Sequence, residues 1–395
     1  MALSTVELLE KALKEIYIDP IIKTIDEQSG PVLAAIEKTS KPVVGNVFKF
    51  GLQYGRHGGI GARAEDDDLP TAAPRHYAQG IAAPKNLFGR INFSERLMLT
   101  SKNNEAAFID AVSTQMEDIT NDARDMMRRN LMGTSSGVMA HVKSVSGANV
   151  VIADTDKIKT FYVGQVLDIF TEGASPTYKA QGVTVVDVDY ASNIVTLDKE
   201  VTAAENDAIS LSGNYNNELI GLKEVLTSDT KIYGIDRSKN KWFNPHVYDK
   251  SNSGKPVAFN SMYLQEAIDD IDDFTGQKPN FICCDAGVQR AYIEEQNSYK
   301  RNLEYKDIDG GYRTISYNDV AISKEKYMDP NTIYVINTDQ FMLAQLADWG
   351  WMDADGAILT RIANKAAYEA TLTKYCELVC KMPSAQAVVK GVAEV

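Results

Sequence analysis

Residues 43–101 place the strongest constraint on how this chain of 395 residues folds. Two segments with strand-like alternation, Val43–Leu52 and Phe88–Leu99, flank about 35 residues that are rich in glycine, include Pro70 and Pro74, and carry many charges. A connection of this length is unusual within a compact domain. We therefore expect this loop to be either disordered or held by a partner. A long two-stranded arm that reaches out of its own subunit fits both alternatives.

The clearest helix is predicted over residues 104–132. Apolar side chains recur there at steps of three to five residues, from Phe108 to Leu131, and polar side chains fill the other faces. Gly133 is suited to end the helix. About 28 residues make a rod on the order of 40 Å long, which indicates a structural spine. A shorter amphipathic helix is predicted over residues 5–16.

Residues 138–213 have a different character from their neighbours. Short β-branched runs alternate there with turn signals such as Ser146–Asn149 and Ala191–Asn193. This pattern predicts a small all-β barrel or sandwich, which we interpret as an inserted domain. After Glu218 a mixed α/β body is predicted, with an exposed aromatic turn at Trp349–Gly356. The expected helices there cover 262–274 and 286–295, and the expected strands cover 280–284, 312–322, 332–337, 368–381 and 385–392.

The charge balance excludes several classes of function. The chain has 41 basic and 54 acidic side chains, which gives a net charge of −13. A sequence-general nucleic-acid binder needs a basic stripe, and a protein that docks on anionic lipid needs a basic face. No apolar run approaches the length that spans a bilayer, and no secretory signal is visible, so we expect folding in a cytoplasm. The four cysteines are expected to be reduced, mostly buried thiols.

The sequence contains no convincing catalytic or metal-binding constellation. Gly133–Gly137 matches the Gly-x-Ser-x-Gly pattern around Ser135, but that motif needs a strand before it and a helix after it, and here the predicted order is reversed. The glycines of 55–61 lack the Lys-Ser/Thr end of a phosphate loop. The four histidines are scattered, and the acidic run 65–68 is expected to be a solvated turn or an ion-pair partner. No catalytic residue, cofactor or metal is predicted.

The order and spacing of several segments resemble one known family. They are the helix end Met126–Gly133, the stretches Asn217–Leu222, Tyr233–Ser238 and Trp242–Pro245, and the succession Trp349–Gly356, Tyr368–Lys381 and Ala385–Gly391. On these segments the chain resembles the major capsid (coat) proteins of tailed bacteriophages, which have the Hong Kong 97-type fold. The resemblance covers most of the chain outside the inserted β-domain.

The resemblance implies an α+β fold with four named parts. They are an N-terminal arm (1–42), an extended E-loop that lies over a neighbouring subunit (43–101), a peripheral (P) domain with the spine helix (102–137 and 330–382) and an axial (A) domain (218–329 and 383–395). The inserted β-domain (138–217), which the residue pattern predicts, is added to these parts.

The function that the resemblance implies is structural and not enzymatic. Such a subunit self-assembles as pentamers and hexamers into an icosahedral head shell, in the virion, after assembly in the host cytoplasm. It works with scaffolding and portal proteins and encloses double-stranded DNA without sequence-specific binding, and no membrane partner is expected. The predicted intersubunit contacts are Arg56, Arg63, Glu65, Asp66, Asp67, Asp68, Arg75, Arg90, Trp349, Trp351, Asp353 and Asp355.

Three alternatives remain open from the sequence. An encapsulin-type shell subunit would share the fold but enclose a cargo protein. A tail-tube subunit would be another structural assembly protein of a phage. A hydrolase that uses Ser135 is the third alternative.

Overall fold

The structure is a computed structural model that describes most of the chain and divides it into two compact units. The described residues are 30–55, 57, 59–68, 70–71, 74–96, 105–173, 175–227, 231–298, 305–308, 312–353 and 356–394, with only the backbone described for 105–113, 305, 307–308 and 312–313. The first unit contains the described residues up to Arg129 and from Val225 onward, and the second is Asn130–Glu224. The predicted helix over residues 5–16 lies outside the described residues.

A seven-stranded mixed sheet is the centre of the α/β part of the first unit. Its strand order is β14 (His246–Asp249), β23 (Ala387–Lys390), β19 (Thr332–Ile336), β15 (Phe281–Cys284), β18 (Val320–Lys324), β17 (Tyr312–Tyr317) and β16 (Tyr305–Ile308). The central strands β15 and β19 are buried along their whole length, which explains why they read as continuous apolar runs.

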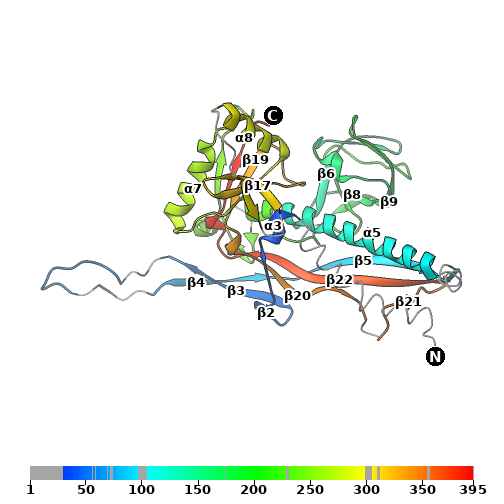
Figure 1. Ribbon diagram of the computed structural model, residues 1–395, viewed down its shortest axis with the longest axis horizontal. Coiled ribbons are helices and arrows are strands. Elements are labelled where there is room, and N and C mark those ends of the chain that lie inside the picture. Colours follow the sequence, from blue (N-terminus) through cyan, green and yellow to red (C-terminus); the bar gives the residue numbers. More distant parts are fainter. Residues whose placement is uncertain are drawn as a thin grey trace. The chain divides into compact units, whose positions relative to one another are not determined.

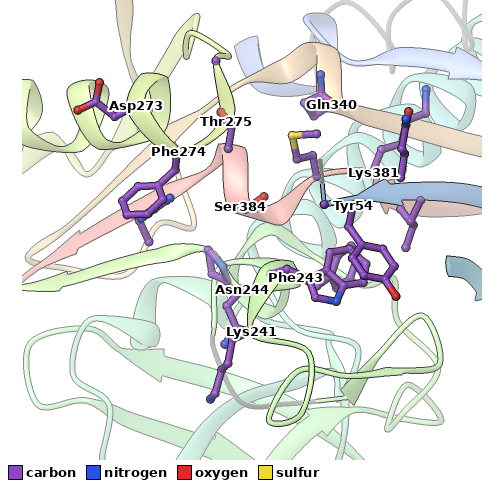
Figure 2. Close-up of a pocket in the computed structure, with 18 of the residues that line it drawn as sticks. Tyr54, Lys241, Phe243, Asn244, Asp273, Phe274, Thr275, Gln340, Lys381 and Ser384 are labelled. Carbon is purple, nitrogen blue, oxygen red and sulfur yellow. The ribbon is translucent and has the colours of Figure 1, made fainter. Parts of the chain in front are cut away.

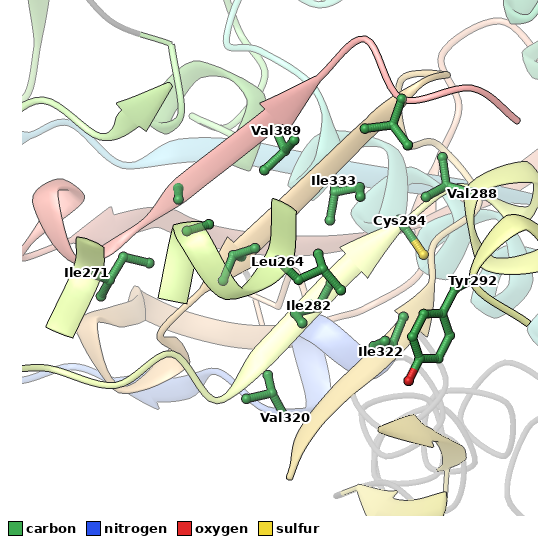
Figure 3. Close-up of a cluster of buried hydrophobic side chains, with 14 of the residues drawn as sticks. Leu264, Ile271, Ile282, Cys284, Val288, Tyr292, Val320, Ile322, Ile333 and Val389 are labelled. Atoms are coloured by element: carbon green, nitrogen blue, oxygen red, sulfur yellow. The ribbon is translucent and has the colours of Figure 1, made fainter. Parts of the chain in front are cut away.

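Helices α7 (Met262–Thr275) and α8 (Ala286–Ser298) pack against this sheet. Leu264 and Ile271 of α7 point into one apolar cluster with Ile282 of β15 and Ile333 of β19, as Figure 3 shows. Helix α7 ends where Gly276 adopts φ 66°, a left-handed conformation that glycine accepts without strain. The predicted helices over 262–274 and 286–295 are confirmed.

One expectation for this part of the chain is corrected. The interval 312–322 forms two strands, because Asn318 and Asp319 both have positive φ and turn the chain as a tight hairpin. Strand β19 lies beyond residue 330, where the predicted peripheral domain resumes, and it pairs with both β15 and β23 in this sheet. The division into domains stays a prediction. Strand order in a sheet follows tertiary pairing, which the local sequence pattern does not encode.

A second sheet of the first unit lies along the long helix. It consists of β1 (Glu37–Thr39), β20 (Phe341–Trp351), β22 (Ala367–Cys380) and β21 (Thr360–Arg361), and β5 (Lys85–Ser94) pairs with the free side of β22. The predicted spine helix is confirmed as α5 (Glu105–Met132). A Cβ atom at Gly89 would lie 2.9 Å from Cδ1 of Ile119, so this glycine allows β5 to approach α5 closely.

The first unit also contains a hairpin and several short elements. The hairpin sheet consists of β2 (Val43–Val44), β3 (Val47–Tyr54) and β4 (His76–Ala82). The short elements are α3 (Pro31–Ala34), β12 (Lys231–Ile232), β13 (Ile235–Asp236) and the 3-10 helices Lys241–Phe243, Thr338–Gln340 and Pro383–Ala385. Helix α6 (Leu222–Val225) spans the boundary between the units.

The second unit is built around a closed β-barrel. Its strands close in the order β10 (Ile194–Leu197), β7 (Asn149–Ile152), β6 (Val138–Ser146), β11 (Ala208–Leu211), β8 (Val166–Thr171) and β9 (Thr177–Asp189). Inward side chains such as Ile169 and Val185 fill the interior. The buried carboxylate of Asp168 accepts backbone hydrogen bonds from Gly182 and Gly213 at 2.8 and 3.0 Å, so its burial leaves no unsatisfied charge.

We predict that Ile282→Ala lowers the free energy of unfolding of the first unit by about 2–5 kcal/mol, because it leaves a cavity in the cluster of Figure 3. Val247→Ala is the control on edge strand β14, where Val247 is 42 % exposed, and should change stability by at most about 0.5 kcal/mol. Urea unfolding followed by a probe in the first unit measures both. Equal effects of the two substitutions would contradict the placement of this core.

Candidate assembly surfaces

The root of the predicted arm is anchored in its own unit. Alternate residues of β3, including Phe48, Phe50 and Leu52, are buried, which follows from the period of two in a strand with one covered face. The ring of Phe50 meets that of Tyr233 edge-on at 5.4 Å, and the backbone N–H of Ile81 donates to the Tyr233 carbonyl at 3.0 Å. The expectation of an outstretched arm over all of 43–101 is therefore wrong for β3, β4 and β5.

A stacked aromatic pair marks the outer end of this anchored root. The ring centroids of Tyr54 and Trp242 lie 4.2 Å apart, and the angle between the ring planes is 8°. The ring of His76 also stacks on Tyr54, with a centroid distance of 5.5 Å. Tyr54 and His76 are also the last register pair of β3 and β4. Beyond this pair the hairpin continues as the loop of residues 55–75, which Figure 1 shows as a long extension of the ribbon.

The loop of residues 55–75, which we call the tip, has no buried residue among those described. Ile60 is 85 % exposed. The acidic run 65–68 is fully on the surface and turns on itself: Ala64 N–H donates to the Asp67 carboxylate at 3.3 Å, and Arg63 Nε donates to the Asp68 carbonyl at 3.2 Å. The described contacts of these residues are thus within the tip, and its surface remains available to a partner.

A cavity of about 940 Å³ opens beneath the anchored root. Figure 2 shows Tyr54, Phe243 and Phe274 around it together with Lys241 and Lys381. Its remaining lining includes Trp242, Arg75, Asp272, Asp273, His246, Gln340, Met382 and Ser384. Cationic and anionic side chains both line the cavity, so its walls do not favour a ligand of one charge.

His246 is the histidine among the described lining residues of this cavity, and it is half-buried. Burial lowers the pKa of His246, and the neighbouring carboxylate of Asp270 offsets only part of that shift. Its ring packs against Phe274 at a centroid distance of 5.1 Å. The lowered pKa favours the neutral imidazole, and its contact with the ring of Phe274 gives this wall of the cavity the character of a packing surface.

The sequence-predicted contact residues outside the tip fall into different environments. Arg90, on the exposed face of β5, forms an ion pair with Glu369 of β22 within the chain. Near it the half-exposed ring of Phe88 meets Tyr375 edge-on at 6.4 Å. Asp353 is exposed, whereas Arg56 and Asp355 lie outside the described residues.

The expectation of an exposed aromatic turn is wrong for its two tryptophans. Strand β20 continues through this region, where Gly350 pairs with Thr373 and Trp351 with Leu372 of β22. Trp349 is 2 % exposed and Trp351 is also buried. The Trp-Gly-Trp pattern resembles a turn locally, but pairing with a long neighbouring strand extends β20 across it.

An ion pair supports the buried end of β20. Lys374 Nζ contacts the carboxylate of Asp348 and lies 5.9 Å from the ring centroid of Trp349. Burial alone would raise the pKa of Asp348, but the attraction and hydrogen bond of Lys374 outweigh it and hold that pKa below its usual value. This region is therefore interior structure of the subunit.

The alternative reading of Ser135 as a nucleophile gains no support from its surroundings. The motif follows α5 and precedes β6, the reverse of a nucleophile elbow. Ser135 N–H donates to Glu224 at 2.7 Å, while His141 pairs with Asp154 at 3.0 Å. Burial raises the pKa of Cys284, Cys376 and Cys380 to about 12, so these thiols stay protonated.

No group of three or more His, Cys, Asp or Glu side chains in the described part of the chain could hold a metal ion. Over the same residues, every helix is too short or too polar to cross a membrane.

Similarity to known proteins is found at the level of structure. No protein-family profile matches the sequence, and no curated protein is significantly similar to it. The chain is similar to the cyanophage A-1(L) capsid subunit, with 9 % identity, a TM-score of 0.53, and coverage of 91 % of this chain and 90 % of that one. It is also similar to a subunit in the capsid of an empty GTA particle, with 10 % identity, a TM-score of 0.50, and coverage of 92 % and 90 %.

These similarities establish the fold. The chain has the fold of phage capsid subunits, and the predicted α+β fold of the Hong Kong 97 type is confirmed.

We predict that Trp349→Ala lowers the free energy of unfolding by about 3–5 kcal/mol, because a buried aromatic side chain is lost. Asp353→Ala, four residues later on the surface, is the control and should have an effect within about 0.5 kcal/mol. Urea denaturation of the two variants and the wild type measures the change in the free energy of unfolding. An unchanged free energy of unfolding for Trp349→Ala would indicate that this side chain lies in an exposed turn.

Proposed function

We propose that the chain is the major capsid protein of a tailed phage and self-assembles into an icosahedral head shell that encloses the genome. The single observation that supports this most is the structural similarity to two capsid subunits over about nine-tenths of both chains. The exposed tip of residues 55–75 supports it independently, since a segment whose described residues are not buried in their own chain fits a subunit completed by its neighbours.

The physical logic of a closed shell fits these parts. Shell subunits meet through heterologous contacts that symmetry closes. In this proposal the N-terminal arm (1–42) and the E-loop hairpin contact neighbours, α5 with the β20–β22 sheet forms the peripheral domain, and the seven-stranded sheet forms the axial domain near the five- and sixfold axes. The barrel is the inserted domain. A protruding hairpin can add burial or strand pairing on a neighbour without enlarging the core of the subunit.

The contact residues follow from exposure. In the tip, Arg63 and the acidic run 65–68 are exposed, as is Arg75 at its base, and we assign them to intersubunit contacts. Asp353 is assigned to a contact as well. Arg90 contributes through the outer face of β5, where its ion pair with Glu369 leaves it partly exposed. Arg56 and Asp355 remain predictions from the sequence, and the buried tryptophans are no longer assigned to contacts.

The proposed partners follow from the same assignment. Scaffolding and portal proteins would act during assembly in the host cytoplasm, and the virion would be the final location. The net charge of −13 fits a wall that encloses double-stranded DNA without gripping it, because like charges do not release counterions on contact.

Expression of the full chain, alone and with a scaffolding protein, tests the assignment by electron microscopy. We expect closed icosahedral shells. Thin tubes would support a tail-tube subunit, and shells that capture a protein cargo in place of DNA would support an encapsulin. A preparation that stays monomeric under all assembly conditions would contradict the proposal.

We predict that replacing residues 55–75 with Asn-Gly abolishes stable shells and leaves a folded subunit. Tyr54 and His76 are directly paired, so a two-residue turn closes the hairpin without changing its register. No described residue in the replaced stretch is buried, so the unfolding midpoint should match that of the wild type. Sedimentation and microscopy measure assembly.

A matched control for this replacement is the single substitution Ile60→Ser. It removes the exposed apolar side chain of the tip but keeps the loop length and its charges. Assembly of this variant should be weakened less than that of the shortened hairpin. Normal shells from the shortened hairpin would show that the tip is not an intersubunit element.

A further inference from the structure

A buried carboxylate lies under the segment that leads into strand β1. Glu325 follows β18 directly, and its backbone N–H donates to the Cys284 carbonyl at 3.1 Å, which fixes its position. Its side chain is 2 % exposed. The backbone N–H of Val32 donates to Oε1 of Glu325 at 3.4 Å, and the Arg128 guanidinium lies 3.9 Å from Oε2.

The backbone at Gly30 covers this carboxylate. A Cβ atom at Gly30 would lie 3.1 Å from Oε2 of Glu325 and 3.4 Å from Nε of Arg128, so residue 30 touches both charged groups. Helix α3, which begins one residue later, is drawn beside α5 in Figure 1. Displacing residues 30–36 would therefore expose the carboxylate of Glu325 to water, whereas the side chain of Arg128 is already 26 % exposed.

The contacts compensate an ionised carboxylate poorly. The hydrogen bond from Val32 is long, and the separation from Arg128 exceeds that of a charge-assisted hydrogen bond, which is about 2.7–2.9 Å. Nε of Arg128 has no hydrogen-bond partner among the described residues. A buried charge without close partners costs free energy, which is recovered when the site opens to solvent.

The other ionisable groups around the site do not change this balance. Asp125, one turn before Arg128 on α5, accepts hydrogen bonds from Lys326 Nζ at 2.8 Å and from the Tyr327 hydroxyl, and these contacts lower its pKa against the effect of burial. The buried thiols of Cys283 and Cys284 on β15 have raised pKa values and are neutral. Arg128 is thus the principal group that favours ionisation of Glu325.

We propose that protonation of Glu325 strengthens the attachment of residues 30–36 to the rest of the subunit. Burial of Val32, Leu33 and Ile36 holds the segment at every pH. The neutral carboxyl strengthens this attachment to α5 and the end of β18, and the ionised carboxylate weakens it. Residues 30–36 connect residues 1–29 to β1, which pairs in parallel with β20 from Glu37↔Met342 to Thr39↔Ala344. The proton on Glu325 thereby controls how firmly the N-terminal segment is attached to the subunit. This inference stands on the geometry of the subunit and does not depend on the proposed function.

The direction of the pH dependence follows from linkage. Burial raises the pKa of Glu325 to about 7, against an ordinary value of 4.5, and Arg128 offsets only part of the shift. The closed form therefore binds more protons than the open form between these two values. Its advantage is fully present below the lower value, declines as pH rises through the interval, and is lost above about pH 7.

Hydrogen exchange of the full-length chain tests the pH-dependent attachment of residues 30–36. The amides of Ala34, Ala35 and Ile36 donate to Gly30, Pro31 and Leu33 carbonyls at 3.2–3.3 Å, so their protection reports closure of the segment. After correction for intrinsic exchange, we expect protection in the wild type to fall roughly tenfold from pH 6 to pH 8. Glu325→Gln, which is neutral at every pH, should abolish this fall.

Glu117→Gln is the matched control, because Glu117 lies on the same helix α5 as Arg128 but is exposed, and it should retain the fall of the wild type. Protection that is constant or rises with pH in the wild type would overturn the proposal, as would an unchanged fall in Glu325→Gln. If Glu325→Gln does not fold, the wild-type profile decides the question alone, since its direction separates a released carboxylate from one held by Arg128.

Discussion

The antiparallel pairing of β5 with β22 connects the main parts of the first unit. Ten residue pairs join the two strands, from Ala367↔Ser94 to Cys376↔Lys85, while the other side of β22 is occupied by β20 and β21. Gly89 in β5 lets α5 approach from the apolar face. Because β5 follows the hairpin directly in the chain, this pairing gives the hairpin a fixed base from which to leave the body.

The root and the tip of the hairpin differ in burial. Its root buries one face, with Phe50 against Tyr233, and ends in the stacked rings of Tyr54 and Trp242. Its tip buries nothing among the described residues and carries the acidic run 65–68. Because the root is anchored, the unburied tip is restricted in position before it contacts a partner. Association of the tip with that partner then costs less conformational entropy than it would for a free loop.

The N-terminal segment adds a titratable contact to apolar burial. Like the hairpin root, residues 30–36 bury apolar side chains, here Val32, Leu33 and Ile36, and such burial varies little with pH. Residues 30–36 also rest on the poorly compensated carboxylate of Glu325. Of the two segments suited to contacts with neighbours, one is thus held in part by a contact that responds to pH. In a shell built from many copies, such a difference would let one segment rearrange while the other keeps its place.

The sequence by itself determined the local elements of this protein, because periodicity and end signals are local. The repeat of apolar residues from Phe108 to Leu131 predicts α5, and the β-branched runs between turn signals indicate the strands that form the barrel. Only the tertiary structure decided which elements are neighbours. It extended β20 through Trp349, placed β19 in the centre of the seven-stranded sheet and put Glu325 beneath Gly30, since burial and pKa depend on residues distant in the chain.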